Sequence, residues 1–231
     1  MAPVFRPTWV EVDLETIKEN YKNIKRYVYG AEIIAVVKAN AYGMGLLPTV
    51  GALANAGCRY FAVATPDEAF ELRASGFRGS VLVIGPAIGS CAPLYVKHDI
   101  ETVCADEGFL DQLNACGVEQ GRRVKVHFKI ETGLGRSGFA PEHFLAKAGK
   151  FYSLPGIEAA GIMSHFAVAD EGRSGFTERQ FERFSRVLKT LEARGINVGT
   201  RHICNSSGTL LYPRMHIDAV KWYSTAPTVR F

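Results

Sequence analysis

The segment "AVVKANAYGMG", residues 35–45, ends an apolar run on Lys38 and continues with Tyr42 and two glycines. A lysine held at the mouth of an apolar pocket has a lowered amine pKa and can form a Schiff base with an aldehyde. Tyr42 could then contact the bound group, and Gly43 and Gly45 would let the backbone approach an anionic phosphate closely. The alternative is an ordinary solvated lysine at the end of a strand.

Polar side chains also stand where three later apolar segments end. Arg136, within "GLGRSG", offers a fixed donor for a phenolate or a carboxylate. His165 closes the run "GIMSH", where a histidine is either catalytic or a core residue with satisfied hydrogen bonds. Asn205 and Ser206 open "NSSGTLL", where their polar groups suit a phosphate or cap a helix in the ordinary way.

The glycines of the same loop, Gly133, Gly135 and Gly138, spell G-x-G-x-x-G. This spacing is typical of dinucleotide-binding turns, which open the first strand–helix unit and expect an acid where the next strand ends. Here the motif lies in the middle of the chain, and the nearest acid, Glu158, lies where its strand begins. The context therefore disfavours binding of NAD.

The segment "RVKVHFKI", residues 123–130, alternates apolar residues with Lys125, His127 and Lys129. If its apolar face packs on outer helices, these three side chains point into the interior of a barrel, where charged groups need partners or a ligand. A strand with one face in water would show the same alternation. This segment alone leaves both interpretations open.

The elements that must position these residues alternate between short apolar runs and amphipathic segments. Apolar residues at three- and four-residue spacing predict a helix over 14–29, with Asp13 as its N-cap. Further helices are expected at 66–75, 106–116, 141–151 and 175–194. Candidate strands are 33–38, 60–64, 80–84, 99–104, 123–130, 157–165, 200–204 and 217–221.

Eight strands with helices between them predict an α/β fold with parallel pairing. A (β/α)8 TIM-type barrel is the simplest closure of that count, and a doubly wound open sheet is the alternative. In such a barrel, the catalytic residues lie at the carboxyl ends of the strands, where the polar residues above are expected.

Composition narrows the class of protein. The 231 residues, 47% hydrophobic and 22% charged, fit one large globular domain. The net charge of +4 comes from scattered residues, so no nucleic-acid partner is expected. No apolar run is long enough for a membrane span and the start lacks a signal-peptide pattern, so we expect a cytoplasmic protein. Five cysteines without a CxxC pair indicate neither a disulfide framework nor a metal site.

Five segments together resemble the N-terminal barrel domain of the pyridoxal-phosphate (PLP)-dependent alanine racemase family. They are "TWVEVDLETIKENY", "AVVKANAYGMG", "HFKIETGLGRSG", "SHFAVAD" and "CNSSGTLLYP", in the family's order. The resemblance runs from Thr8 to Lys221. It implies a PLP-dependent isomerase that interconverts L- and D-alanine, supplying D-alanine for peptidoglycan, and works as a homodimer.

The resemblance also implies roles for single residues. Lys38 would hold the cofactor as an aldimine and act as a base on the substrate α-carbon. Tyr42 and Ser206 would bind the phosphate, where we also place Asn205. Arg136 would donate a hydrogen bond to the phenolic oxygen of the cofactor.

The resemblance implies roles for three further residues near the cofactor. His165 would lie beside the ring and orient the group that meets the pyridine nitrogen. Lys129 matches a position that is carbamylated in some members, where the carbamate holds in place the arginine that corresponds to Arg136. A different arginine meets the ring nitrogen in the family, and this chain has Lys221 at that position.

The chain departs from the family's pattern near its end as well. We expect the barrel domain at 1–221 and a divergent tail at 222–231, "WYSTAPTVRF", in place of the glycine-containing phosphate loop that closes the family's barrel. The family's C-terminal β-rich domain, which supplies a tyrosine base to the partner subunit, is missing here, so we expect weak or no racemase activity. The alternatives are a non-catalytic PLP carrier and another PLP enzyme of this barrel class, a D-amino-acid aldolase or a decarboxylase.

Overall fold

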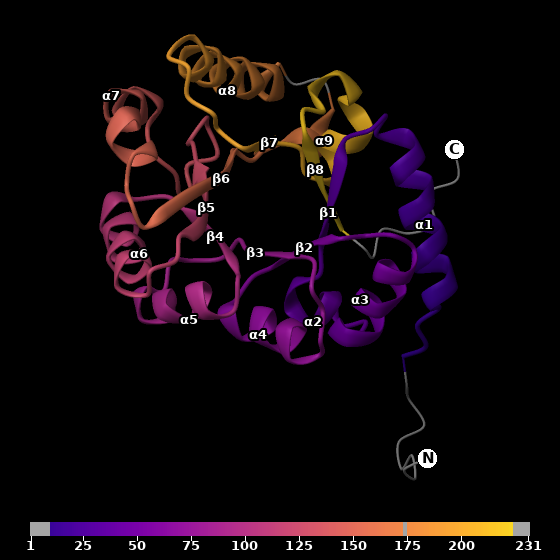
Figure 1. Ribbon diagram of the computed structural model, residues 1–231. Coiled ribbons are helices and arrows are strands. Elements are labelled where there is room, and N and C mark those ends of the chain that lie inside the picture. The colour runs from indigo at the N-terminus through magenta and orange to yellow at the C-terminus, as the bar shows by residue number, and fades with distance from the viewer. Residues whose placement is uncertain (1–9, 173–174, 224–231) are drawn as a thin grey trace.

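The computed structural model describes residues 10–172 and 175–223, and the strands in these ranges close into one parallel barrel surrounded by helices (Figure 1). Each strand pairs with the next along the chain, in the order β1 to β8. The strands are β1 Glu32–Val36, β2 Tyr60–Val63, β3 Ser80–Val83, β4 Glu101–Cys104, β5 Val124–Lys129, β6 Ile157–Met163, β7 Thr200–His202 and β8 Ala219–Tyr223.

Helices connect successive strands along the outside of this ring. No helix in the described part of the chain is both long and apolar enough to cross a membrane. The helices are α1 Leu14–Tyr27, α2 Lys38–Tyr42, α3 Leu46–Asn55, α4 Pro66–Ala74, α5 Ala92–Lys97, α6 Glu107–Glu119, α7 Pro141–Tyr152, α8 Phe176–Ala193 and α9 Ser206–Leu211.

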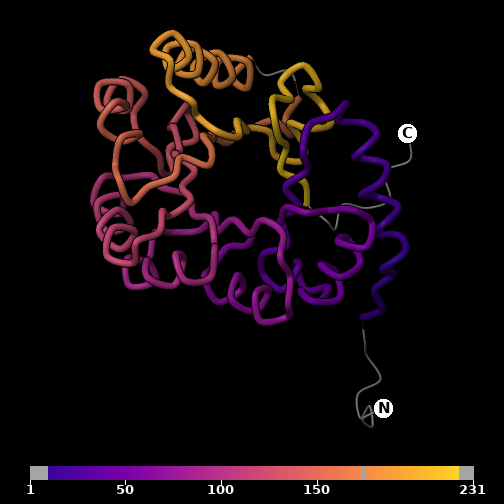
Figure 2. Tube along the Cα trace, viewed as in Figure 1, coloured from indigo at the N-terminus to yellow at the C-terminus, as the bar shows by residue number. Residues whose placement is uncertain are grey.

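The barrel closes where the last strand meets the first. β8 runs parallel to β1 in a register that extends from Glu32 opposite Ala219 to Val36 opposite Tyr223. Figure 2 shows the chain making one circuit, so that its indigo start and yellow end lie side by side. The predicted (β/α)8 barrel is therefore confirmed, and the open doubly wound sheet is wrong.

The observed last strand begins and ends two residues later than the predicted one. β8 was expected at 217–221, but it runs from Ala219 to Tyr223, and Trp222 is buried between the barrel and its outer layer. The barrel thus includes two residues, Trp222 and Tyr223, that we had assigned to the tail. The remainder of that tail, 224–231, lies outside the described residues.

The core has two layers, one on each side of the strands. Between the strands and the helices lies a large apolar layer that includes Ile24, Phe128 and Phe144. Inside the barrel lies a smaller cluster, of which Ile34 and Met163 are members. Side chains alternate between the two layers because successive residues of a strand point to opposite faces.

This alternation settles the question left open by residues 123–130. Val124, Val126 and Phe128 are buried against the outer helices, whereas His127 and Lys129 are buried inside the barrel. The interpretation of a strand with one face in water is therefore wrong for this segment.

Helix α1 begins as the sequence predicts. The side chain of Asp13 accepts hydrogen bonds from the backbone N–H groups of Glu15 (2.9 Å) and Thr16 (3.1 Å), which makes it the N-cap. The helix ends at Tyr27, two residues before the expected end, because Tyr29 and Gly30 have positive φ.

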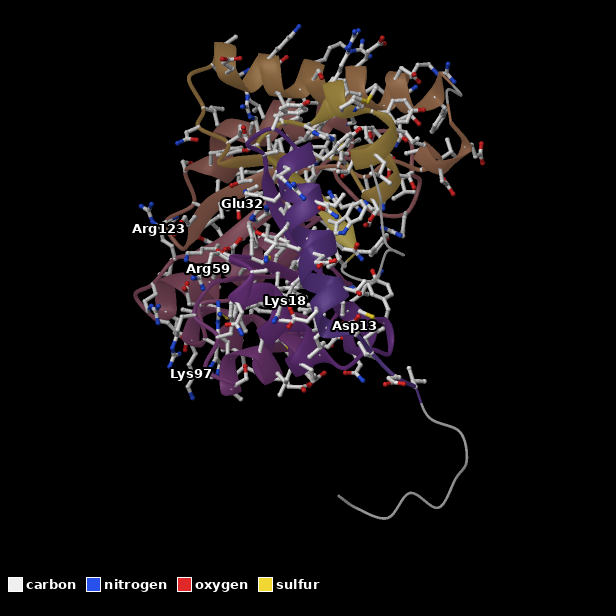
Figure 3. All side chains as sticks on the ribbon, turned by 90° about the vertical axis from the view of Figure 1, so that its right-hand side faces the viewer. Asp13, Lys18, Glu32, Arg59, Lys97 and Arg123 are labelled. Carbon is white, nitrogen blue, oxygen red and sulfur yellow. The ribbon has the colours of Figure 1, made fainter. Side chains whose placement is uncertain are left out.

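The two ends of the barrel can be told apart in Figure 3. Glu32 begins β1, and Arg59 and Arg123 immediately precede β2 and β5; all three lie on one side of the molecule in this view. That side carries the beginnings of the strands. The residues with predicted chemical roles follow the strands and therefore lie at the opposite end.

Candidate active site

Lys38 lies in a strained turn rather than in the strand to which we had assigned it. β1 ends at Val36, and the four residues after Lys38, Ala39 to Tyr42, have φ between 52° and 56°. They form a left-handed turn, which costs roughly 1–2 kcal/mol for each residue with a Cβ. A sequence without glycine at these positions needs outside support to hold this shape.

Glu68, at the start of α4, supplies much of that support. One of its carboxylate oxygens accepts hydrogen bonds from the backbone N–H groups of Ala39 (2.5 Å) and Asn40 (3.3 Å). The other accepts from Ala64 (2.8 Å) and Thr65 (3.3 Å) after β2. Glu68 therefore ties the turn that carries Lys38 to the end of the neighbouring strand.

The end of the barrel holds a cavity of about 500 Å³, large enough for a ring-sized ligand. It collects the side chains of six predicted site residues from different strand ends. These are Lys38, Lys129, Arg136, His165, Asn205 and Lys221. Four of the six are lysine or arginine, so the cavity favours an anionic ligand.

Arg136 reaches the cavity from a loop between β5 and α7. The ends of this loop are joined by backbone hydrogen bonds from Glu131 N–H to Phe139 (2.9 Å) and from Phe139 N–H to Lys129 (2.8 Å). The Glu131 carboxylate accepts from the N–H groups of Gly133 and Gly135 inside the loop. The glycines of the G-x-G-x-x-G motif thus shape this loop.

Lys129 stands beneath that loop. It is buried, and its Nζ donates a hydrogen bond to the Ser137 hydroxyl at 2.6 Å. Burial lowers the pKa of the Lys129 amine, and the nearby Arg136 guanidinium lowers it further, against a smaller opposing effect of Glu131. A larger fraction of this amine is therefore neutral than in an exposed lysine.

His165 follows β6 by two residues and lines the cavity. Burial lowers its pKa to about 3, and the positive charges of Lys221, Arg136, Lys129 and Lys38 act in the same direction. The imidazole is therefore neutral at physiological pH. It can accept or donate a hydrogen bond there but brings no positive charge to the cavity.

Lys221 lies in the middle of β8 and is 3% exposed. Its Nζ lies 3.2 Å from Nδ1 of His202, at the end of β7. Burial lowers its pKa to about 7, with a smaller raising effect of Cys204 and a lowering effect of Lys129. The histidine in hydrogen-bond contact with this amine is therefore His202, a residue that our sequence analysis did not single out.

The remaining predicted residues lie around the edge of the cavity. Tyr42 and Ser206 do not line it; the ring of Tyr42 packs edge-on against Tyr223, at 5.0 Å between ring centres. Ser206 Oγ accepts a hydrogen bond from the backbone N–H of Tyr223 at 3.0 Å. Asn205 both lines the cavity and caps α9, because its Oδ1 accepts from the N–H of Gly208 at 2.8 Å.

Comparison with known proteins identifies the family. The profile described as "Alanine racemase, N-terminal domain" matches residues 12–222. The chain belongs to the alanine racemase family. It is 38% identical over 217 residues to the alanine racemase of Clostridium tetani, and 39% identical over 223 residues to alanine racemase 2 of Caldanaerobacter subterraneus subsp. tengcongensis.

These family members are longer than the chain. The matches cover 94% and 96% of this chain but only 56% and 58% of the two relatives, so the chain spans a little over half their length. Among solved structures, alanine racemase of Clostridium difficile 630 in complex with cycloserine superimposes with a TM-score of 0.92 at 27% identity. That match covers 96% of this chain and 61% of the solved one.

A second family structure, alanine racemase from Bacillus anthracis with bound L-Ala-P, superimposes with a TM-score of 0.88 at 30% identity. The match covers 96% of the present chain and 58% of the Bacillus anthracis one. The shared part is the barrel. No cluster of three or more His, Cys, Asp or Glu side chains that could hold a metal occurs among the described residues.

Proposed function

We propose that this chain binds PLP in the cavity at the end of the barrel and uses Lys38 to move the α-proton of alanine. The observation that carries the proposal is that Lys38 shares one cavity with Arg136, His165 and Lys221, although these residues follow or occupy four different strands. Membership of the alanine racemase family supports the same chemistry.

The cavity suits this cofactor in size and charge. A volume of about 500 Å³ accommodates a substituted pyridine ring, and its four basic side chains favour a phosphate ester and a phenolate. A basic cavity that is lined by a lysine also suits an aldehyde, with which the amine can form a Schiff base. When bound, PLP supplies an electron sink that lowers the barrier to removing the α-proton.

Each residue then has a role at a stated atom. Lys38 Nζ would hold the cofactor covalently and act as the base. Arg136 would donate to the phenolic oxygen, and Lys221, which lines the cavity, would meet the ring nitrogen. Tyr42, Asn205 and Ser206 would bind the phosphate.

Two neighbours support these groups. His165, neutral at physiological pH, packs beside the ring without adding charge. Lys129 is the candidate for carbamylation, because its burial favours the neutral amine that reacts with carbon dioxide. A carbamate on Lys129 would place a negative charge close to Arg136 and hold the guanidinium over the cavity.

Racemisation requires removal of a proton on one face of the α-carbon and delivery on the other. Lys38 accounts for one face, and therefore for exchange of the α-proton with solvent. We expect the chain loaded with PLP to exchange the α-proton of alanine, and one enantiomer of alanine to exchange faster than the other. D-alanine production for peptidoglycan is the role we propose for the longer family members and, through them, for this domain.

The test combines cofactor uptake with proton exchange. The chain is mixed with PLP, reduced with borohydride and digested, and we expect the modification on the peptide that contains Lys38. With L- or D-alanine in deuterated water, the α-proton signal of alanine should decay in the presence of the loaded chain.

Lys38→Ala is the control, and it should abolish both signals. Uptake without exchange would make the chain a non-catalytic carrier. Release of an aldehyde from D-threonine, or of carbon dioxide from a basic amino acid, would assign it to the aldolases or decarboxylases. Absence of any adduct at Lys38 would overturn the proposal.

A further inference from the structure

The interior of the barrel contains a chain of polar side chains that extends away from the cavity. It starts at Lys221, continues through His202 and His127, and ends at Glu101, the first residue of β4. Consecutive atoms are 3.2, 2.9 and 2.9 Å apart. The hydroxyl of Tyr60 completes the end of the chain with hydrogen-bond contacts to Glu101 and His127.

All of these groups are removed from water. The exposed fraction is 0% for both histidines, 3% for Lys221 and 6% for Glu101. Burial alone would raise the pKa of Glu101, but the hydrogen bonds from His127 and from the Tyr60 hydroxyl lower it below its ordinary value. Glu101 is therefore a buried negative charge inside the barrel, outside the lining of the cavity, whose charged side chains are lysines and an arginine.

The contacts can be satisfied by donation in the direction from Lys221 to Glu101. If Lys221 is an ammonium, it donates to Nδ1 of His202, so that His202 carries its proton on Nε2. That proton is donated to Nδ1 of His127, which in turn carries its own proton on Nε2 and donates it to Glu101. Every group is satisfied with both imidazoles neutral.

The reverse direction satisfies the same contacts. A protonated Glu101 donates toward His127, which then donates from Nδ1 to His202. His202 in turn donates from Nδ1 to the lone pair of a neutral Lys221 amine. Since both arrangements are complete, a proton can change ends without breaking the chain.

We propose that Glu101, His127 and His202 form a proton relay that ends at Lys221, so that Lys221 can meet the ring nitrogen either as an ammonium or as a neutral amine. In one shift, a Lys221 proton passes to Nδ1 of His202 and the Nε2 proton of His202 passes to Nδ1 of His127. The Nε2 proton of His127 passes to Oε2 of Glu101. Lys221 and Glu101 lose their charges together, and both imidazoles stay neutral.

The lysine is what makes such a relay useful. A guanidinium cannot give up its proton in a protein, whereas a buried lysine amine can. Other groups that face Lys221 are Cys204 beyond β7, Lys129 from β5 and His165 beyond β6. Two of these, Lys129 and His165, are bases beside the same amine, so Glu101 is the acid in contact with the chain that can balance its charge.

The sheet is built around the middle of the relay. A Cβ atom on Gly161 would lie 2.3 Å from Nδ1 of His127, so only glycine leaves room for the imidazole. The register of β5 against β6 shifts between Val126 and His127, which brings Gly161 opposite His127. The irregularity of the sheet thus coincides with the buried histidine.

The relay is tested in the chain without cofactor, so the result does not depend on PLP binding. Lysines carry ¹³C at Cε, and their titration is followed by NMR from pH 5 to 10; the signal missing in Lys221→Arg identifies Lys221. We expect its midpoint near pH 7. In Glu101→Gln the midpoint should fall by at least about half a pH unit, roughly a threefold loss of proton affinity, because the buried counter-charge is gone.

Glu32→Gln is the matched control, since Glu32 begins β1 at the same end of the barrel but pairs with Lys25 at 3.8 Å outside the relay. It should leave the Lys221 midpoint unchanged. A midpoint near the ordinary lysine value of 10.5, or one that Glu101→Gln does not move, would overturn the relay.

A second measurement needs no variant. Imidazole ¹⁵N spectra of the unsubstituted chain should show His127 and His202 in the same tautomer, because the relay requires both to point the same way. Opposite tautomers, or an imidazolium at His202, would contradict it. Adding PLP then separates the two proposals: failure to form the Lys38 link would refute cofactor binding and leave the relay result standing.

Discussion

At the scale of single residues, one arginine holds together two of the loops that lead into the strands. The guanidinium of Arg73 in α4 donates to the backbone carbonyls of His98 (2.9 Å), Phe77 (3.1 Å), Gly79 (2.8 Å) and Asp99 (2.7 Å). These carbonyls belong to the loops before β3 and β4. A planar fork with five N–H groups can satisfy such a set, and an ammonium cannot.

Arg73→Met should therefore lower the free energy of unfolding by about 2–4 kcal/mol, because it leaves these carbonyls without their charged donor. Arg73→Lys should recover only part of the loss. Urea unfolding measures both, with the exposed Arg78→Met at the end of the same connection as control. Equal stability of the Met variants at positions 73 and 78 would refute this role.

At the scale of elements, the turn after β1 shows a short segment held in an unfavourable conformation by a distant side chain. Ala39 to Tyr42 adopt the left-handed region, and Glu68 binds two of their backbone N–H groups. The same carboxylate binds the end of β2, so it fixes the position of Lys38 relative to the neighbouring strand.

Glu68→Ala removes all four of these hydrogen bonds and leaves the strain of the turn uncompensated. We expect the free energy of unfolding to fall by about 2–4 kcal/mol and the borohydride-fixed PLP adduct at Lys38 to form more slowly. Glu71→Ala, an exposed position on the same helix, is the control. If Glu68→Ala left both stability and adduct formation unchanged, the turn would have to be held by its own residues.

The difference between what the sequence predicts and what it cannot predict follows from the range of the contacts. Asp13 caps α1 through residues two and three positions away, and the strand at residues 123–130 follows from the alternation within one segment; the cap and the strand were both predicted. The left-handed turn was not, because alanine has no preference for it and Glu68 lies 28 residues beyond Asn40. Nothing local predicts that conformation.

The partner of Lys221 was missed for the same reason. His202 ends a strand of three residues, and only the closure of the barrel brings it to Lys221, 19 positions further along the chain. One signal was present: His202 lies within the predicted strand 200–204, two residues before the strand end at which functional residues of a barrel gather. The arrangement of the strands in the closed barrel, rather than residue type, decides which histidine contacts the Lys221 amine.

At the scale of the whole molecule, the barrel encloses bases that resist protonation. Burial lowers the pKa of His165 to about 3, and it lowers the pKa of His202 well below its ordinary 6.5. The charge of Lys221 acts on both in the same direction. Folding therefore keeps two imidazoles neutral that the unfolded chain would protonate in mild acid.

The stability of the fold should consequently fall as the pH drops below 6.5. Between pH 6.5 and the lowered values, the unfolded chain binds protons that the folded one excludes, so each histidine reduces stability by about 1.4 kcal/mol per pH unit. At pH 5 the loss from both is about 4 kcal/mol relative to pH 8. Urea unfolding at pH 8, 6.5 and 5 measures it. His165→Asn should roughly halve the slope of the unfolding free energy against pH, because the variant has one fewer histidine that only the unfolded chain protonates. An unchanged slope in this variant would show that His165 is protonated in the folded barrel.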